Sequence, residues 1–239
     1  MSSITFTFSG KSCTEFGIVA FDAGTYGADA NEYEVIRVPG RNGDLLISNN
    51  RYPNRAHSYN CIIYENAVEN YRNFRAWLMS QIGYKRLIDS RYPNEYLQAY
   101  VASSLDPELT PEEGLIKFKL TFMRNPKRYL SSGYVGVVFT QTGTITNPTL
   151  YAALPTLIIT GTGVVGINDT NITIKRNPGR LGISCELGRC YDFASGAGGW
   201  DDAIELSTID FPKLNPGNNA VALGTGITRV ELIPQWWTI

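Results

Sequence analysis

Apolar and polar residues alternate along most of the first 130 residues, as they do in half-buried β-strands. The opening segment Ile4–Phe8 is typical, because threonines separate its three apolar residues. The same pattern predicts six further strands in this region, at Glu34–Val38, Asp44–Ile47, Ser58–Tyr64, Tyr84–Ile88, Tyr96–Ser104 and Leu115–Phe122. This part of the chain is therefore predicted to be rich in β-structure.

One segment between residues 66 and 82 has a different period. Its apolar residues recur every three or four positions, which is the spacing of one helix face; they are Val68, Tyr71, Phe74, Leu78 and Ile82. Asn66 followed by Glu69 resembles a capping box, and Gly83 suits the residue after a helix end. The pattern predicts one long helix.

The second half of the chain has fewer charged residues and shorter apolar runs. Residues 1–130 hold 15 Lys/Arg and 14 Asp/Glu, whereas residues 131–239 hold only 6 and 8. Short apolar runs between glycine, threonine and asparagine predict strands at Tyr134–Phe139, Thr156–Thr160, Ile172–Lys175, Leu181–Cys185, Ala203–Leu206, Ala220–Leu223 and Ile227–Ile233. Many short strands with turn signals are typical of a β-sandwich. We therefore expect two domains, 1–130 and 131–239.

Composition narrows the function classes. A hydrophobic content of 43% with 18% charged residues is enough for a buried core, and a net charge of −1 gives no electrostatic reason for nucleic-acid binding. Apolar runs stay well short of a membrane helix, so membrane insertion is not expected. The first residues have no secretory-signal pattern. In a reducing cytoplasm the four cysteines, Cys13, Cys61, Cys185 and Cys190, are expected to be buried free thiols.

The most distinctive local motif is Val38–Leu46. Pro39-Gly40 suits the centre of a type II turn, and Asn42-Gly43 is a strong signal for a primed hairpin turn. The two dipeptides flank Arg41, which predicts a rigid, charged hairpin that no helix could accommodate. Taken alone, the motif also fits an ordinary solvated hairpin.

Two glycine motifs resemble nucleotide-binding loops. Ser9–Ser12 ends like a phosphate-binding loop, but Thr5 stands where that loop needs its first glycine. Gly161–Gly166 has the spacing of the dinucleotide fingerprint, yet Ile167–Asn171 predicts a turn into another strand where the motif needs a helix. Glycines of a β-hairpin explain the second motif better, so no nucleotide cofactor is expected.

Catalytic and metal-binding constellations are also poorly supported. His57 is the single histidine, and Asp201-Asp202 would face opposite sides of a strand. Cys185 and Cys190 have no second pair that would complete a tetrahedral metal site. We predict no catalytic residue, metal or cofactor.

Trp200 follows the loop Ala194–Gly199, and Trp236-Trp237 lie near the end of the sequence. Aromatic platforms on a sandwich stack on sugar rings, which makes Trp200 a candidate glycan platform. Alternatively, the tryptophans seal the sandwich core and an interface.

Several separated landmarks, taken in order, resemble the distal tail proteins of long-tailed phages. They are Phe8–Ser12 with Glu15–Ile18; Val38–Leu45 with Asn50–Tyr52; the helix with Asp89–Pro93, Tyr96 and Ala99–Tyr100; Phe118–Phe122 with Tyr129; and Leu214–Asn218 with Ile227, Val230, Leu232 and Trp236. The resemblance extends over nearly the whole chain.

This resemblance implies a mainly β protein with a ring-forming N-terminal domain and a C-terminal sandwich like those of galectins or carbohydrate-binding modules. It implies a structural role in the virion, after synthesis in the host cytoplasm. A hexameric ring would connect the tail tube protein to the tail-tip protein, with baseplate or receptor-binding proteins attached. Pro39, Gly40, Arg41 and Gly43 would then mark turn and assembly. The alternative is a carbohydrate-binding module or host-glycan adhesin that uses the sandwich.

Overall fold

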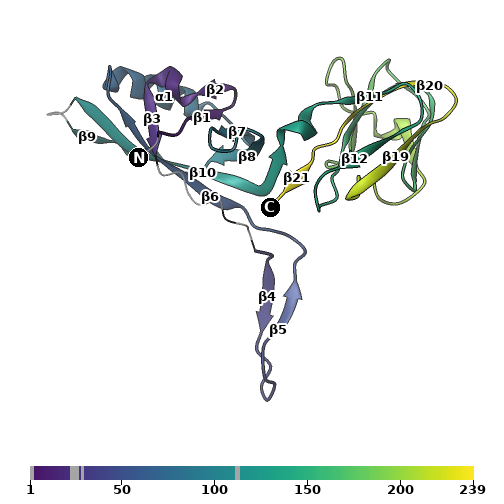
Figure 1. Ribbon diagram of the computed structural model, residues 1–239, viewed down its shortest axis with the longest axis horizontal. Coiled ribbons are helices and arrows are strands. Elements are labelled where there is room, and N and C mark those ends of the chain that lie inside the picture. Colours follow the sequence, from purple (N-terminus) through teal and green to yellow (C-terminus); the bar gives the residue numbers. More distant parts are fainter. Residues whose placement is uncertain (1–2, 22–26, 28–29, 111–113) are drawn as a thin grey trace. The chain divides into compact units, whose positions relative to one another are not determined.

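The computed structural model describes residues 3–21, 27, 30–110 and 114–239, and it is mainly β (Figure 1). The chain divides into two compact units. Residues 1–128 with Ile239 form the N-terminal unit, and residues 129–238 form the C-terminal unit. A single α-helix occurs among the described residues. The fold class predicted from the sequence is therefore confirmed at the level of a mainly β protein with one helix.

The N-terminal unit contains one large antiparallel sheet. Its strand order is β2-β1-β7-β8-β10-β6-β3, and β9 joins β10. The strands are β1 (Phe6–Phe8), β2 (Lys11–Ser12), β3 (Ile18–Phe21), β6 (Arg55–Ile63), β7 (Lys85–Asp89), β8 (Glu95–Val101), β9 (Glu108–Thr110) and β10 (Leu115–Leu130). The short 3-10 helix η1 (Cys13–Phe16) follows β2. Every predicted strand of this sheet is present, and most ends shift by one to three residues, but β10 continues eight residues beyond its predicted end at Phe122. Strands β2, β3 and β9 were not predicted.

Helix α1 (Ala67–Met79) packs on this sheet. The ring centre of Tyr71 in this helix lies 5.3 Å from the ring centre of Phe118 on β10, and the ring centre of Phe74 lies 5.7 Å from it. β10 pairs with β6 in continuous register from Ile116 opposite Ile63 to Arg124 opposite Arg55. The alternation of β6 and β10 therefore turns one sheet face toward α1 and forms the unit's core.

The helix differs from its prediction at both ends. Val68 is 71% exposed and Ile82, beyond the helix, is 86% exposed, whereas Ala67 is buried. Asn66 has a left-handed backbone and makes no side-chain cap, so the predicted capping box is wrong. A capping box forms instead at η1: the Ser12 side chain accepts a hydrogen bond from the backbone of the first turn, and the Glu15 side chain accepts one from the Ser12 N–H. Spacing alone included Val68, which lies on the solvent side of the helix, and Ile82, which lies beyond its end.

β4 (Tyr33–Ile36) and β5 (Leu45–Ser48) form a separate two-stranded sheet. Their register runs from Tyr33 opposite Ser48 to Ile36 opposite Leu45. Residues 37–44 form the connecting loop. The hairpin predicted from the sequence is present, but its loop is longer than the two-residue turn predicted at Asn42-Gly43.

The C-terminal unit is a β-sandwich of two five-stranded antiparallel sheets, ordered β11-β20-β13-β16-β17 and β12-β19-β14-β15-β18 (Figure 1). The first contains β11 (Val137–Phe139), β13 (Thr156–Gly161), β16 (Leu181–Ser184), β17 (Arg189–Asp192) and β20 (Ile227–Ile233). The second contains β12 (Gly143–Asn147), β14 (Gly163–Ile167), β15 (Thr170–Ile174), β18 (Ile204–Leu206) and β19 (Gly217–Leu223). The remaining elements are η2 (Ser131–Tyr134), η3 (Asp201–Ala203) and β21 (Trp237–Thr238).

Both sheets contribute to one apolar core. Ile159 and Val230 come from the first sheet, Val165 and Ile172 from the second, and all four are fully buried. Three strands of the two sandwich sheets were not predicted, namely β12, β14 and β17, because glycine, asparagine or charged residues interrupt their apolar pattern. The likeness of this sandwich to galectins stays a prediction.

Candidate assembly surface

The hairpin Tyr33–Ser48 is the most unusual surface of the described residues. Its loop contains the turn Val38–Arg41, in which the Arg41 N–H donates to the Val38 carbonyl at 3.2 Å. Gly40 has a φ of +79°, as the centre of a type II turn requires. Gly43 has a φ of +81°, but Asn42 is not left-handed, so the primed turn predicted there does not form.

The hairpin strands are apolar on both faces. Because opposite residues of an antiparallel pair share a face, Val35 lies beside Leu46, and Ile36 lies beside Leu45 on the other side. Val35 is 55% exposed, Leu46 57% and Ile47 44%. Soluble surfaces carry single exposed apolar residues, but a two-faced apolar ribbon indicates a contact with another protein.

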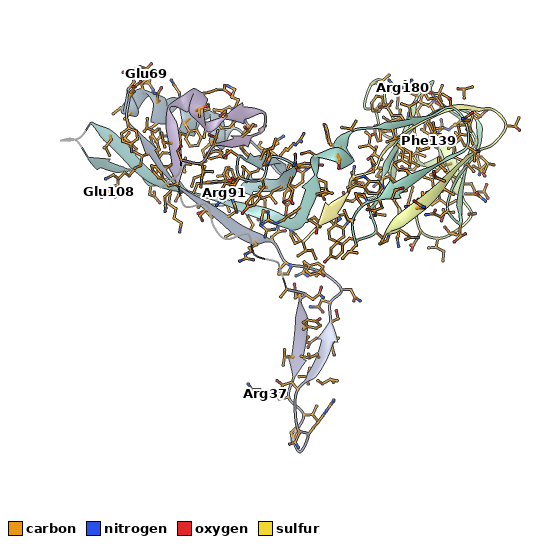
Figure 2. All side chains as sticks on the ribbon, viewed as in Figure 1. Arg37, Glu69, Arg91, Glu108, Phe139 and Arg180 are labelled. Atoms are coloured by element: carbon orange, nitrogen blue, oxygen red, sulfur yellow. The ribbon has the colours of Figure 1, made fainter. Side chains whose placement is uncertain are left out.

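The closed end of the hairpin is charged. Arg37, Arg41 and Asp44 are exposed, and Figure 2 labels Arg37 near this end. Apolar strands with a basic loop give the hairpin two kinds of contact group. The structure places the four predicted residues Pro39, Gly40, Arg41 and Gly43 together in this loop.

A bidentate ion pair fixes the open end of the hairpin. Arg51 donates through Nε and Nη2 to the two carboxylate oxygens of Glu32, at 2.7 and 3.1 Å. The Glu32 N–H donates to the Arg51 carbonyl, and the Asn49 N–H to the Glu32 carbonyl. The hydrogen bonds from Arg51 hold the pKa of Glu32 below its usual value. An isolated two-stranded ribbon is marginal in water, and this clamp keeps its strands in register.

His57 lies in a buried polar cluster. Its Nε2 is 3.9 Å from the Asp89 carboxylate, which also accepts from Tyr59 at 3.1 Å and from Arg91. Burial raises the pKa of Asp89, but the neighbouring His57 imidazole and the hydrogen bonds from Arg91 outweigh this effect and hold the pKa below its usual range. The cluster joins β6 to the end of β7. It contains no nucleophile in the arrangement that acyl transfer needs.

The residues considered for other chemistry are separated. Asp201 and Asp202 lie on η3, where the sequence predicted a strand; Asp201 pairs with Arg189 and Asp202 with Arg176. Trp200 is partly buried, and the Arg176 guanidinium lies over its ring at 4.6 Å. One face of the candidate glycan platform is therefore covered by a cation.

The two glycine motifs are β-structure. Ser9-Gly10 is a two-residue turn with positive φ at both positions, joining β1 to β2, and only the four-residue η1 follows. Gly161–Gly166 joins β13 to β14, so no helix opens at this motif. The predicted turn and hairpin are present, because β14, which contains Gly163 and Gly166, pairs antiparallel with β15 across the turn at Asn168-Asp169, whereas Gly161 ends β13 in the other sheet.

The remaining sequence predictions concern thiols, metals and membranes. All four cysteines are buried and free, and burial raises the pKa of Cys185 and Cys190 to about 12. Within the described ranges, no cluster of three His, Cys, Asp or Glu could hold a metal ion. No described helix has both the length and the apolar character that crossing a membrane requires.

Residues 12–123 match the family model of the phage tail protein RIFT-related domain. This segment is similar to a domain of phage tail proteins. It includes the hairpin Tyr33–Ser48, helix α1 and most of the sheet. Among curated proteins, no significant match was found.

Three solved structures share the fold of this chain. The crystal structure of SPP1 Dit, described as a paradigm of the hub adsorption apparatus in phages infecting Gram-positive bacteria, aligns over 100% of both chains with a TM-score of 0.67 and 14% identity. Chains of the phage P2 baseplate in its activated conformation align with TM-scores of 0.56 (97% of both chains, 9% identity, with Ca) and 0.52 (96% of both chains, 10% identity, with Sr). The predicted resemblance to distal tail proteins is confirmed.

Proposed function

We propose that this phage tail protein is the hub at the distal end of a siphophage tail. Residues 1–130 form a homo-hexameric ring that connects the tail tube to the tail-tip protein, and residues 131–239 carry baseplate or receptor-binding proteins. The role is structural, and the protein resides in the virion. The fold shared with SPP1 Dit over both full chains supports this assignment.

The exposed hairpin is the observation that carries the proposal. Its two apolar faces cannot both rest on one flat surface, so a groove or two neighbouring chains must cover them. In a rotationally closed ring, each subunit presents two different surfaces to its neighbours. A ribbon inserted between two such surfaces would be covered on both sides. Because Val35, Leu46 and Ile47 are only about half exposed, covering the rest of each side chain would contribute roughly 1 kcal/mol.

Native mass spectrometry and negative-stain microscopy of the purified protein test the ring. The expected species is a closed ring of about six times the 26.5 kDa chain mass. Leu46→Asp places a charge in the apolar ribbon and is expected to shift the population to monomers. Leu187→Asp is the matched control, because Leu187 is also an exposed leucine (75%) but lies in the C-terminal unit.

Different results would contradict the proposed ring and the proposed hairpin contact. A wild-type protein that stays monomeric at high concentration contradicts the ring itself. A ring that forms normally with Leu46→Asp contradicts the hairpin as its contact surface. Circular dichroism of each variant separates loss of assembly from loss of folding.

A further inference from the structure

The solvent-facing side of helix α1 carries an unusual row of side chains. Val68, Arg72, Arg75 and Met79 follow the spacing of one helix face and are all exposed, and Ile82 is exposed just beyond the helix end. The outer face of an amphipathic helix is ordinarily polar. This row instead has an apolar side chain at each end and two arginines between them, a combination that suits a contact with another protein.

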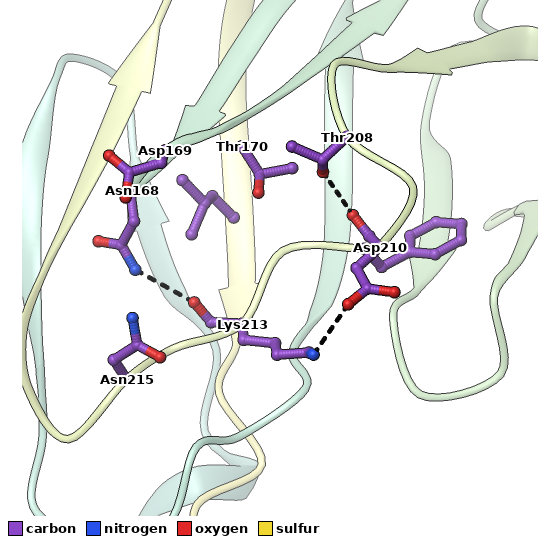
Figure 3. A pocket seen from close by; sticks show the side chains of 9 residues that line it. Asn168, Asp169, Thr170, Thr208, Asp210, Lys213 and Asn215 are labelled. Atoms are coloured by element: carbon purple, nitrogen blue, oxygen red, sulfur yellow. Dashed lines mark hydrogen bonds and ion pairs between the residues drawn. The ribbon is translucent and has the colours of Figure 1, made fainter.

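The two arginines of this row are unpaired within the described part of the chain. Neither guanidinium forms an ion pair or a hydrogen bond there, and Glu69, three residues before Arg72, forms no ion pair with it. Other exposed charges pair locally. In the hollow at one end of the C-terminal sandwich, for example, Lys213 pairs with Asp210 at 3.2 Å (Figure 3). Arg72 and Arg75 are therefore available to a carboxylate of another molecule.

One face of the hairpin Tyr33–Ser48 has the complementary pattern. Glu34 lies opposite Ile47, and Ile36 lies opposite Leu45, so these four side chains share a face, which we call the Glu34 face. Glu34 is exposed, and no described residue forms an ion pair or a hydrogen bond with its carboxylate. The Glu34 face therefore presents one unpaired carboxylate beside three apolar side chains.

The spacing of charged and apolar groups also matches between the two surfaces. On the helix, Arg75 and Met79 lie on one face and are separated along the axis by a rise of about 6 Å. On the hairpin, Glu34 and Ile36 lie on one face of the same strand and are about 7 Å apart. A Glu34 carboxylate that meets Arg75 therefore brings Ile36 onto Met79, so that charge meets opposite charge and apolar meets apolar.

We propose that the exposed row of α1 is the docking surface for the Glu34 face of the hairpin from a second copy of this chain. Glu34 pairs with Arg75, beside Arg72, and Ile36 covers Met79. Glu34 and Arg75 are both exposed in the single chain, so the contact forms between chains. It joins two different surfaces, as a ring closed by rotation requires. The inference rests on the proposed ring and names one of the two surfaces that cover the hairpin in it.

Charge reversal with rescue tests this contact, with native mass spectrometry of the full-length protein over a dilution series. Arg75→Glu and Glu34→Arg each place like charges together, and each is expected to raise the concentration at which the assembly dissociates about tenfold. The double variant restores opposite charges and is expected to recover most of this loss. Glu34→Arg combined with Lys213→Glu, which reverses an exposed lysine of the C-terminal unit, has the same net charge and is the matched control; it is expected to recover nothing.

The outcomes separate this contact from the ring itself. A wild-type protein that stays monomeric at every concentration overturns both. A wild-type ring that forms equally well with Arg75→Glu overturns the docking surface on α1 and leaves the ring intact. Weakening by both single variants without recovery in the double variant overturns the pairing of Glu34 with Arg75. Circular dichroism is expected to show native folding of every variant, because the three substituted side chains are exposed.

Discussion

Two glycine-containing turns, alike in sequence, have opposite surroundings in the structure. In the hairpin loop, a Cβ added at Gly40 or Gly43 meets no atom within 4 Å. At the corner between β13 and β14, a Cβ added at Gly161 would lie under 3.0 Å from the Gly226 carbonyl oxygen. Gly163 faces the Thr225 carbonyl in the same way. The first turn needs glycine for its backbone angle alone, whereas the second also needs the space.

The difference separates contacts within the chain from contacts between chains. The corner is where the chain passes from one sheet of the sandwich to the other, and Gly161 and Gly226 allow the two backbones to touch. The hairpin loop touches nothing, and the apolar strands behind it are exposed. A change at the corner should therefore damage folding, while a change in the hairpin should mainly affect assembly.

The largest expected effect comes from Gly161→Ala. The new methyl group meets a backbone oxygen, and the φ of +104° is itself unfavourable for alanine. We expect a loss of about 3 kcal/mol or more in the unfolding free energy of the C-terminal unit. Urea unfolding followed by tryptophan fluorescence measures it, since Trp200, Trp236 and Trp237 lie in that unit. Gly43→Ala is the matched control with positive φ in open space; an equal loss there would refute the role of close approach.

Asp89→Asn tests an internal contact of the N-terminal unit. The carboxylate is buried and bridges Tyr59 and Arg91, so its replacement should cost about 2 kcal/mol at neutral pH. Because the folded pKa of Asp89 is lowered, the wild type keeps this contribution above about pH 5 and loses it as the pH falls below the unfolded value of about 4.

The pH dependence distinguishes this contact from a general acid effect. Urea unfolding at pH 7, 5, 4 and 3 is expected to show a shallower acid loss in Asp89→Asn than in the wild type. Asp44→Asn removes an exposed carboxylate of the hairpin loop and should keep the wild-type slope. Parallel slopes for Asp89→Asn and the wild type would contradict the assigned role.

Local chemistry explains which features the sequence could predict. The turn at Pro39-Gly40 was predictable because proline and glycine fix their own backbone angles. The strands around the central core were predictable because period-two alternation reflects burial on one sheet face. The helix ends were not, because Val68 fits the spacing of the buried face but lies outside it.

Features that depend on contacts between distant segments could not be predicted from the sequence. The hairpin of β14 and β15 was predicted, but nothing local shows that Gly161 ends a strand of the other sheet or that β14 also pairs with β19. The contact between the turn at Asn168 and the loop at Lys213 was missed for the same reason, because these residues lie 45 positions apart. The apolar residues of β4 and β5 were predicted as strands, but their exposure on both faces was not foreseen. The pattern of apolar and polar residues does not show whether a two-stranded ribbon packs against another part of the protein.

Gly40→Val is the next smaller change. The side chain would have room, so the cost is the positive φ alone, about 1 kcal/mol. The strain falls on the hairpin loop, so global unfolding should change little while ring formation weakens. Hydrogen exchange of residues 33–48 and native mass spectrometry measure the two effects. Normal protection and a normal ring would show that the loop can adopt another turn.

Arg41→Ala has the smallest expected effect on stability and isolates assembly. The Arg41 side chain is exposed, and its backbone N–H, which closes the turn, is retained in alanine. The unfolding free energy is therefore expected to stay within about 0.5 kcal/mol of the wild type. If Arg41 lies at a subunit contact, the variant ring should dissociate at a higher protein concentration than the wild-type ring at low salt, and this difference should shrink as salt is added, because ions screen a charged contact. Arg176→Ala, which removes an exposed arginine of the C-terminal unit, controls for net charge. A ring as stable with Arg41→Ala as with Arg176→Ala would leave assembly to the apolar strands and reduce the arginine to a solvated loop residue.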